Sequence, residues 1–82
     1  MTQEQEDFFY RKIDNRAPLS HKMDKWDLDK KKMFLALVET LIEFDPPIIF
    51  EGTFCWRFMK LVESASGLPW SEVRGIYKEC VG

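Results

Sequence analysis

The sequence predicts an all-α fold on two observations. Four segments combine apolar residues at helical spacing with recognisable start and stop residues, and no segment forms a strand that could find a partner. With 82 residues there is room for only one small domain. An apolar share of 45 % and an aromatic share of 15 % are typical of a globular chain and exclude full disorder.

The first predicted helix runs from about residue 3 to residue 14. Thr2 and Gln5 have the spacing of a capping box, in which each side chain bonds the backbone amide of the other residue. The helix carries three large apolar residues, Phe8, Phe9 and Ile13. We expect these three to pack against the outer flank of the next helix, near Leu35 and Ile42, because the apolar arc of that helix is wider than one partner needs. The alternative is that the aromatic residues are exposed and form a partner-binding patch.

The second predicted helix spans residues 28–44 and follows a connector over residues 15–26. Asp27 is a suitable N-cap, and Pro46 ends the helix because a proline disfavours helical geometry in the residue before it. A loop over residues 45–52 follows. Its three apolar residues are expected to fold onto the core: Ile48, Ile49 and Phe50.

The last two predicted helices are separated by a very short connection. The third begins after Thr53 as a cap and ends at Gly67, and the fourth runs from Pro69 to about Val81. Only residues 66–68 join them, so the two helices must cross at a steep angle, as in a helix-turn-helix unit.

The chain has almost no residues suited to enzyme chemistry. It has two cysteines, expected as buried or half-buried free thiols, and its single histidine has no neighbours at zinc-ligand spacing. A glycine-rich phosphate loop and a nucleophile elbow are also missing. We therefore expect no enzyme activity, cofactor, metal or small-molecule substrate. The longest apolar run, residues 33–38, is too short to span a bilayer, and the acidic N-terminus is unlike a signal peptide, so the chain is expected to be intracellular and soluble.

Large aromatic residues mark each of the last three predicted helices. The residues that carry a resemblance are Trp26 with Phe34, Leu35, Leu37 and Val38; Phe54, Cys55 and Trp56 with Met59; and Pro69, Trp70 and Ser71 with Val73 and Tyr77. In this order they resemble the aromatic opening, the second-helix tryptophan motif and the third-helix signature of the Myb domain of Rap-type telomere proteins. Nematode telomere-binding proteins with Rap-like homeodomain repeats are one lineage that fits.

The resemblance implies a three-helix Myb/homeodomain-like helix-turn-helix domain over residues 26–82, preceded by an additional N-terminal helix and connector over residues 1–25. One core cluster is expected to include these nine residues: Trp26, Phe34, Leu37, Leu41, Trp56, Met59, Trp70, Val73 and Tyr77. The resemblance also implies that the exposed face of the last helix makes the functional contacts.

The exposed face of the last helix is the first candidate site. In the Myb/homeodomain-like class this face reads base edges in the major groove. The candidate contact residues are Ser71, Glu72, Arg74, Gly75, Lys78 and Glu79. Their charges sum to zero, and they include neither Asn nor Gln, the usual readers of adenine. The face therefore departs from that of a strong DNA binder.

A second candidate site is a basic excess in the first half of the chain. Residues 11–32 hold eight basic residues against four acidic ones. A basic arm could reach a minor groove, as homeodomain arms do. Its candidate residues are Arg11, Lys12, Arg16, Lys22 and Lys25. The alternative is that the run Lys30–Lys32 is simply the solvated face of a helix.

Two functional hypotheses remain open at this point. The first is a telomere- or chromatin-associated Myb-like module that acts mainly through protein–protein contacts in a nucleoprotein complex, with another telomere or chromatin protein as its partner. The alternative is binding of double-stranded telomeric DNA through the last helix and the basic arm. The net charge of -2 favours the first hypothesis. Both imply a nuclear, chromosomal location and no membrane partner.

Overall fold

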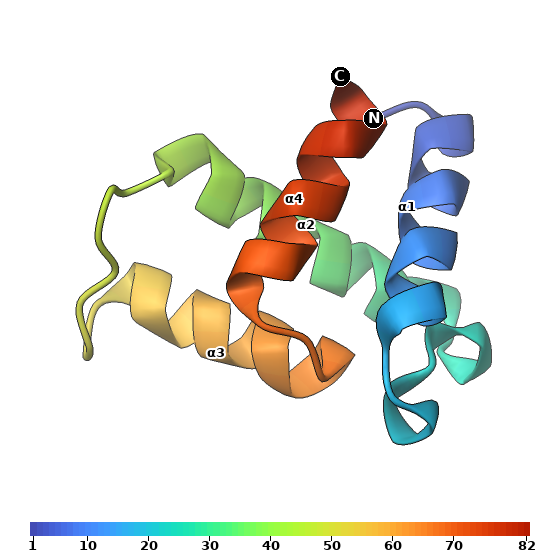
Figure 1. Cartoon of the computed structure of the whole chain (residues 1–82), viewed down its shortest axis with the longest axis horizontal. Coiled ribbons are helices and arrows are strands. Elements are labelled where there is room, and N and C mark those ends of the chain that lie inside the picture. The colour runs from blue at the N-terminus through green and yellow to red at the C-terminus, as the bar shows by residue number, and fades with distance from the viewer.

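The computed structural model describes residues 1–82 and confirms the all-α prediction, since it contains helices and no strands (Figure 1). The four α-helices are α1 (Gln3–Arg16), α2 (Leu28–Phe44), α3 (Phe54–Ser66) and α4 (Trp70–Val81). Two single 3-10 turns, Leu19–His21 and Met23–Lys25, lie in the connector between α1 and α2. None of the helices is both long enough and apolar enough to cross a membrane.

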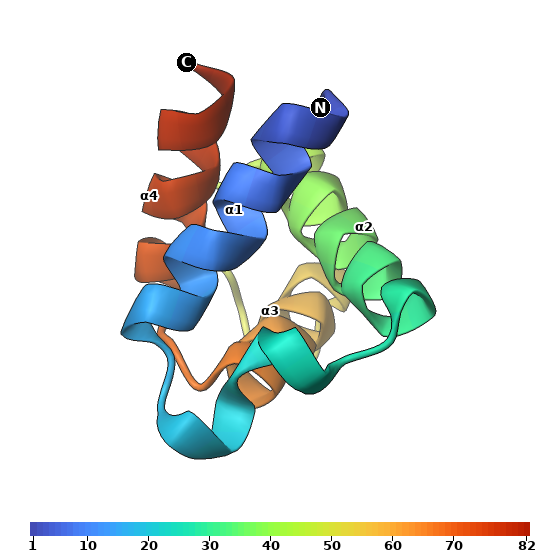
Figure 2. The same cartoon turned by 90° about the vertical axis from the view of Figure 1, so that its right-hand side faces the viewer.

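The helices form two antiparallel pairs that cross steeply. α2 and α3 run side by side in opposite directions, and α1 and α4 do the same (Figures 1 and 2). α4 turns sharply away from α3 at their short connection. The chain ends lie at the same end of the molecule, where α1 begins and α4 finishes.

Local capping residues set the helix limits. The Thr2 side chain accepts a hydrogen bond from the Gln5 amide at 3.2 Å, and the Gln5 side chain accepts one from the Thr2 amide at 2.8 Å, which completes the predicted capping box. Asp27 caps α2 by accepting from the Lys30 amide at 2.7 Å. Gly67 ends α3 with a φ of 71°, the left-handed region that suits glycine. The predicted limits of α2 are confirmed, whereas α1 continues two residues further, to Arg16.

The central core joins residues from all four helices and the connector. Phe9 on α1 is fully buried, with its ring centroid 6.1 Å from that of Phe34 on α2 and 6.0 Å from that of Tyr77 on α4. The core cluster comprises Phe9, Ile13, Met23, Phe34, Leu35, Val38, Leu41, Val62, Leu68, Val73, Ile76 and Tyr77. The N-terminal helix therefore belongs to the same core as the segment over residues 26–82.

The expected packing of α1 is confirmed for two residues and wrong for the third. Phe9 and Ile13 are buried, but Phe8 is 41 % exposed. Residues four apart share a helix face, whereas Phe8 is turned by about 100° from Phe9. The main partner also differs, because α1 packs chiefly against α4. Its contact with α2 is smaller and runs through Phe9 to Phe34 and through the Tyr10 hydroxyl, which donates to the Lys31 carbonyl at 3.3 Å.

Two further expectations about packing are wrong. Trp56 is half-buried but lies outside the core, because α3 turns its Met59 and Val62 face inward. The Lys60 ammonium lies 5.6 Å from the Trp56 ring centroid. In the loop after α2, Ile48 and Phe50 are 65 % and 67 % exposed instead of folding onto the core. The other eight residues of the expected cluster do lie in the core or pack against it.

The connector between α1 and α2 closes over the turn between α3 and α4. His21 Nδ1 lies 3.3 Å from the Ala65 carbonyl oxygen, within hydrogen-bond distance. A Cβ atom on Gly67 would lie 2.8 Å from Pro18 Cδ, closer than atoms can approach. Glycine is therefore required here by both backbone conformation and space.

Candidate functional site

The start of α4 is fixed by residues of α3. The Glu63 carboxylate accepts a hydrogen bond from the Trp70 amide at 2.8 Å. The Ser66 hydroxyl is fully buried, donates to the Val62 carbonyl at 2.8 Å and accepts from the Leu68 amide at 3.2 Å. These bonds satisfy backbone groups that the two helix ends leave unpaired. They also set the direction in which α4 leaves the turn.

Five of the six candidate contact residues on α4 are exposed. These are Ser71, Glu72, Gly75, Lys78 and Glu79. Arg74, the sixth, is half-buried because its side chain reaches across to the residue that follows α2. The sequence pattern thus placed the face correctly, while the contacts of its charged groups depend on the other elements.

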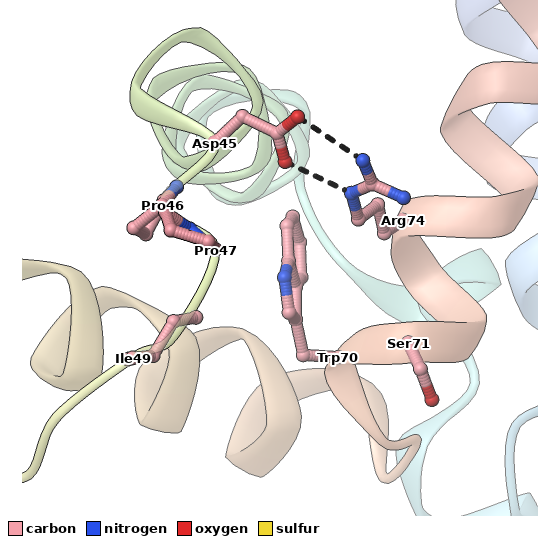
Figure 3. A pocket seen from close by; sticks show the side chains of 7 residues that line it. All are labelled: Asp45, Pro46, Pro47, Ile49, Trp70, Ser71 and Arg74. Atoms are coloured by element: carbon pink, nitrogen blue, oxygen red, sulfur yellow. Dashed lines mark hydrogen bonds and ion pairs between the residues drawn. The ribbon is translucent and has the colours of Figure 1, made fainter.

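Arg74 is held in a two-bond ion pair with Asp45. Its Nε and one terminal nitrogen each donate to a different oxygen of the Asp45 carboxylate at 3.1 Å (Figure 3). Accepting these hydrogen bonds holds the pKa of Asp45 below its usual range, and the same contact raises that of Arg74. Asp45 has a positive φ of 33°, so the end of α2 turns at this residue.

A shallow cavity opens beside this ion pair. It has a volume of about 520 Å³ and is lined by Asp45, Pro46, Pro47, Ile49, Trp70, Ser71 and Arg74. The Trp70 ring stands between the proline pair on one side and the helix carrying Arg74 on the other (Figure 3). An aromatic plane next to prolines and an ion pair offers an apolar surface with a polar rim, which suits a peptide or a side chain of another protein.

A second ion pair joins the far end of α4 to α1. Lys12 Nζ lies 3.1 Å from a carboxylate oxygen of Glu79. With Arg74 paired to Asp45 and Glu79 paired to Lys12, only Glu72 and Lys78 carry unpaired charge on the face. The exposed face of α4 therefore has one free charge of each sign.

The five basic-arm candidates lie on ordered, anchored elements. Arg11, Lys12 and Arg16 are part of α1, which the buried Phe9 and Ile13 hold in the core. The other two lie in the connector: Lys22 donates to the carbonyl of Asp14, and Lys25 is exposed. Lys12 is the one candidate that the fold joins to α4 through an ion pair.

The sequence did not indicate the role of Asp45. The pair Pro46–Pro47 was interpreted only as a helix stop, and no spacing rule links Asp45 to a residue 29 positions later. The available signal was weaker: an acidic residue at the end of a helix, next to prolines and followed later by an arginine with no helical partner. That pattern occurs too widely to identify a pair.

No group of three or more His, Cys, Asp or Glu side chains in the structure could hold a metal ion. Cys55 and Cys80 are half-buried free thiols, as expected. Burial raises the pKa of the Cys80 thiol, which reduces the share of reactive thiolate at neutral pH.

Comparisons with protein-family models, curated proteins and solved structures find no significant match for this chain.

Proposed function

We propose that this chain is a protein-interaction module that presents the exposed face of α4 to a protein partner. The neighbouring cavity beside the Arg74–Asp45 ion pair, called here the Trp70 cavity, belongs to the same surface. The observation that carries the proposal is the Arg74–Asp45 ion pair. Reading of guanine needs a guanidinium whose two parallel N–H groups are free for the base edge. Here both groups already bond one carboxylate of the same chain. Reading of a guanine edge by Arg74 would require breaking this contact.

The charge of the α4 face also supports a protein partner over DNA. Nonspecific DNA affinity grows with the number of phosphates that lysine and arginine neutralise. The α4 face has one free base, Lys78, and it lies on the same helix as the free acid Glu72. Mixed charges beside a cavity with both polar and apolar lining fit a protein surface, where complementary pairs set the register and exclude wrong partners.

The proposed setting is a telomeric or chromatin nucleoprotein complex in the nucleus, with another protein of that complex as the ligand. Its support is the resemblance of residues 26–82 to Rap-type Myb domains. A short turn before a steeply crossing last helix is also compatible with a helix-turn-helix unit. Against the resemblance stands Trp56, one of its carrying residues, because this side chain lies outside the core.

The test against DNA is a titration of the folded chain with fluorescent telomeric-repeat duplex at low and at physiological salt. We expect weak binding that disappears at physiological salt and that does not distinguish the repeat from a shuffled duplex. Asp45→Asn should release the Arg74 guanidinium and strengthen the low-salt binding. A sub-micromolar, sequence-selective complex at physiological salt, lost in Arg74→Ala, would overturn the proposal in favour of DNA reading.

The test for a protein contact uses a photo-crosslinking amino acid placed at Glu72, with a matched control at Glu4 on α1. Both positions are exposed and belong to helices, so the substitution disturbs neither core nor cap. We expect one discrete protein adduct from position 72 in cells that express the chain, and none from position 4. Crosslinks from position 72 to DNA, or equal adducts from both positions, would contradict the proposal.

A further inference from the structure

A second apolar surface lies away from the α4 face, along the groove between α2 and α3. Four of its side chains are mostly exposed: Met33 at 68 %, Phe44 at 67 %, Phe54 at 76 % and Leu61 at 54 %. Residues 33, 37 and 44 share one face of α2, and residues 54, 58 and 61 share one face of α3. None of these residues lines the Trp70 cavity.

The two ends of the groove are each lined by both helices. Phe44, Phe54 and Phe58 line a cavity of about 490 Å³ at the end where the loop joins α2 to α3. At the other end Met33, Leu37 and Leu61 line one of about 240 Å³ together with Trp26. The surface, called here the α2–α3 groove, therefore has an apolar hollow at each end, and both helices line each hollow.

The borders of the α2–α3 groove carry opposite charges at the same level. Glu43 precedes Phe44 on the outer side of α2, and Arg57 precedes Phe58 on the outer side of α3. Both charged residues are exposed, and neither has an ion-pair partner within the chain. Because Phe44 and Phe58 line one cavity, Glu43 and Arg57 lie at the same end of the groove, on opposite borders.

This arrangement is self-complementary under a two-fold axis parallel to the two helices. Such an axis places α2 of one copy against α3 of the other without shifting either along its length, since α2 and α3 lie side by side (Figure 1). Glu43 of each copy then meets Arg57 of the other, so the contact forms twice. An axis perpendicular to the helices would instead place α2 of one copy against α2 of the other. Glu43 of both copies would then lie along one border and Arg57 of both along the other, so the opposite charges would not meet.

The exposed area is large enough for such an interface. A fully exposed aromatic side chain presents about 150–250 Å², and Met and Leu are of similar size. Because these four side chains are only 54–76 % exposed, together they supply on the order of 500 Å² of apolar surface per copy. A standard interface buries about 800 Å² per partner around an apolar centre with a polar rim. The half-buried Leu37 and Phe58 and the charged borders would contribute the remainder.

We propose that the α2–α3 groove is the interface of a symmetric homodimer, in which the groove of one copy covers that of the other and Glu43 pairs with Arg57 across the interface. The resulting four-helix arrangement removes Met33, Phe44, Phe54 and Leu61 from water. It leaves the α4 face and the Trp70 cavity of each copy open, so the dimer presents two identical partner-binding faces.

The test is sedimentation equilibrium of the full chain over a range of concentrations, with a charge-exchange set of variants. Glu43→Arg and Arg57→Glu should each weaken dimerisation by about tenfold, because each places like charges together at two sites. The double variant Glu43→Arg/Arg57→Glu should restore the dimer. Glu4→Arg, an exposed charge reversal on α1, is the matched control and should leave it unchanged.

Circular dichroism of each variant should show an intact fold, since all the altered side chains are exposed. A wild-type chain that sediments as a monomer up to about 1 mM would overturn the proposal. So would a double variant that is no better than the two single ones, because the loss would then not come from the Glu43–Arg57 contact. Neither result would bear on the α4 face, which the dimer leaves exposed.

Discussion

Two aromatic clusters of similar composition occupy very different environments in this small fold. Phe9, Phe34 and Tyr77 form a closed cluster in which each ring is no more than 9 % exposed, with centroid distances of 6.0 and 6.1 Å from the central Phe9. Phe44, Phe54 and Phe58 form an open cluster, with 6.4 Å between the centroids of Phe54 and Phe58. Both clusters lie on the flanks of α2.

The difference comes from the element that covers each cluster. α1 lies over the first and supplies its central ring, whereas no part of the chain lies over the second. Three aromatic side chains close together and exposed to water leave apolar surface unburied, and covering that surface would gain hydrophobic free energy. The contrast teaches that helical periodicity identifies apolar faces but does not say whether the same chain covers them.

The largest expected effect comes from opening the closed cluster. Phe9→Ala should destabilise the fold by about 3–5 kcal/mol, because it removes a fully buried ring and leaves a cavity between three helices. The measurement is urea unfolding followed by circular dichroism. Phe8→Ala is the matched control and should cost less than about 1 kcal/mol, since Phe8 is 41 % exposed. Equal losses for the two variants would contradict the assignment of the closed cluster.

A smaller difference is expected between the two tryptophans of α3 and α4. Trp70 packs against the core and Trp56 does not. Trp70→Ala should therefore cost about 2–3 kcal/mol and Trp56→Ala about 1 kcal/mol or less. Far-ultraviolet circular dichroism is the suitable probe, because both variants alter fluorescence. A Trp56→Ala loss as large as that of Trp70→Ala would place Trp56 in the core after all.

Two glycines sharpen the same contrast between covered and open positions. Gly67→Ala should cost about 1–2 kcal/mol, because the residue has a left-handed backbone and the connector leaves no room for a Cβ atom. Gly75→Ala should stabilise α4 by about 0.5–1 kcal/mol, since nothing lies within 4 Å of a Cβ atom there. Thermal melts of the two variants should shift in opposite directions, and shifts of the same sign would show that one environment is misassigned.

The last expected effect is absent at neutral pH: a pH dependence of stability at the border of the closed cluster. Burial, followed by the charge of Glu6, raises the pKa of Tyr10 to about 12. The folded state therefore keeps a proton that the unfolded state releases near pH 10, so stability falls as pH rises from about 10 to 12. Burial also raises the pKa of Tyr77, so in an ultraviolet titration both tyrosines should ionise above their ordinary range, and Tyr10→Phe should remove the transition near pH 12. Ionisation of both tyrosines at about pH 10 would contradict the burial of both rings.

The fold class and the helix limits were predictable because their signals are local. The capping pairs at Thr2, Asp27 and Thr53 each act over three residues, and Gly67 acts through its own backbone. Such interactions depend little on the rest of the molecule. The largest error in a predicted helix limit is at the C-terminal end of α1, which continues two residues further than predicted. At a helix end, tertiary contacts decide how far the last turn continues.

The tertiary arrangement was less predictable, because it depends on contacts between distant residues. Phe8 and Phe9 are adjacent residues of the same type, and the positions of α2 and α4 determine that Phe9 is the one that is buried. The candidate face on α4 was predictable from periodicity. The ion pairs that neutralise Arg74 and Glu79 on this face were not predictable, because their partners Asp45 and Lys12 belong to elements far along the chain.

The pairing of the first helix with the last has a consequence for folding kinetics. α2 and α3 adjoin in sequence and need to close only a short loop, while the contact from Lys12 to Glu79 spans 67 positions. Closing a long loop costs more entropy and comes before its contacts can compensate. We expect the α2–α3 hairpin to be formed in the folding transition state and α1 to dock afterwards. Phe9→Ala should then accelerate unfolding and leave the folding rate nearly unchanged in stopped-flow measurements.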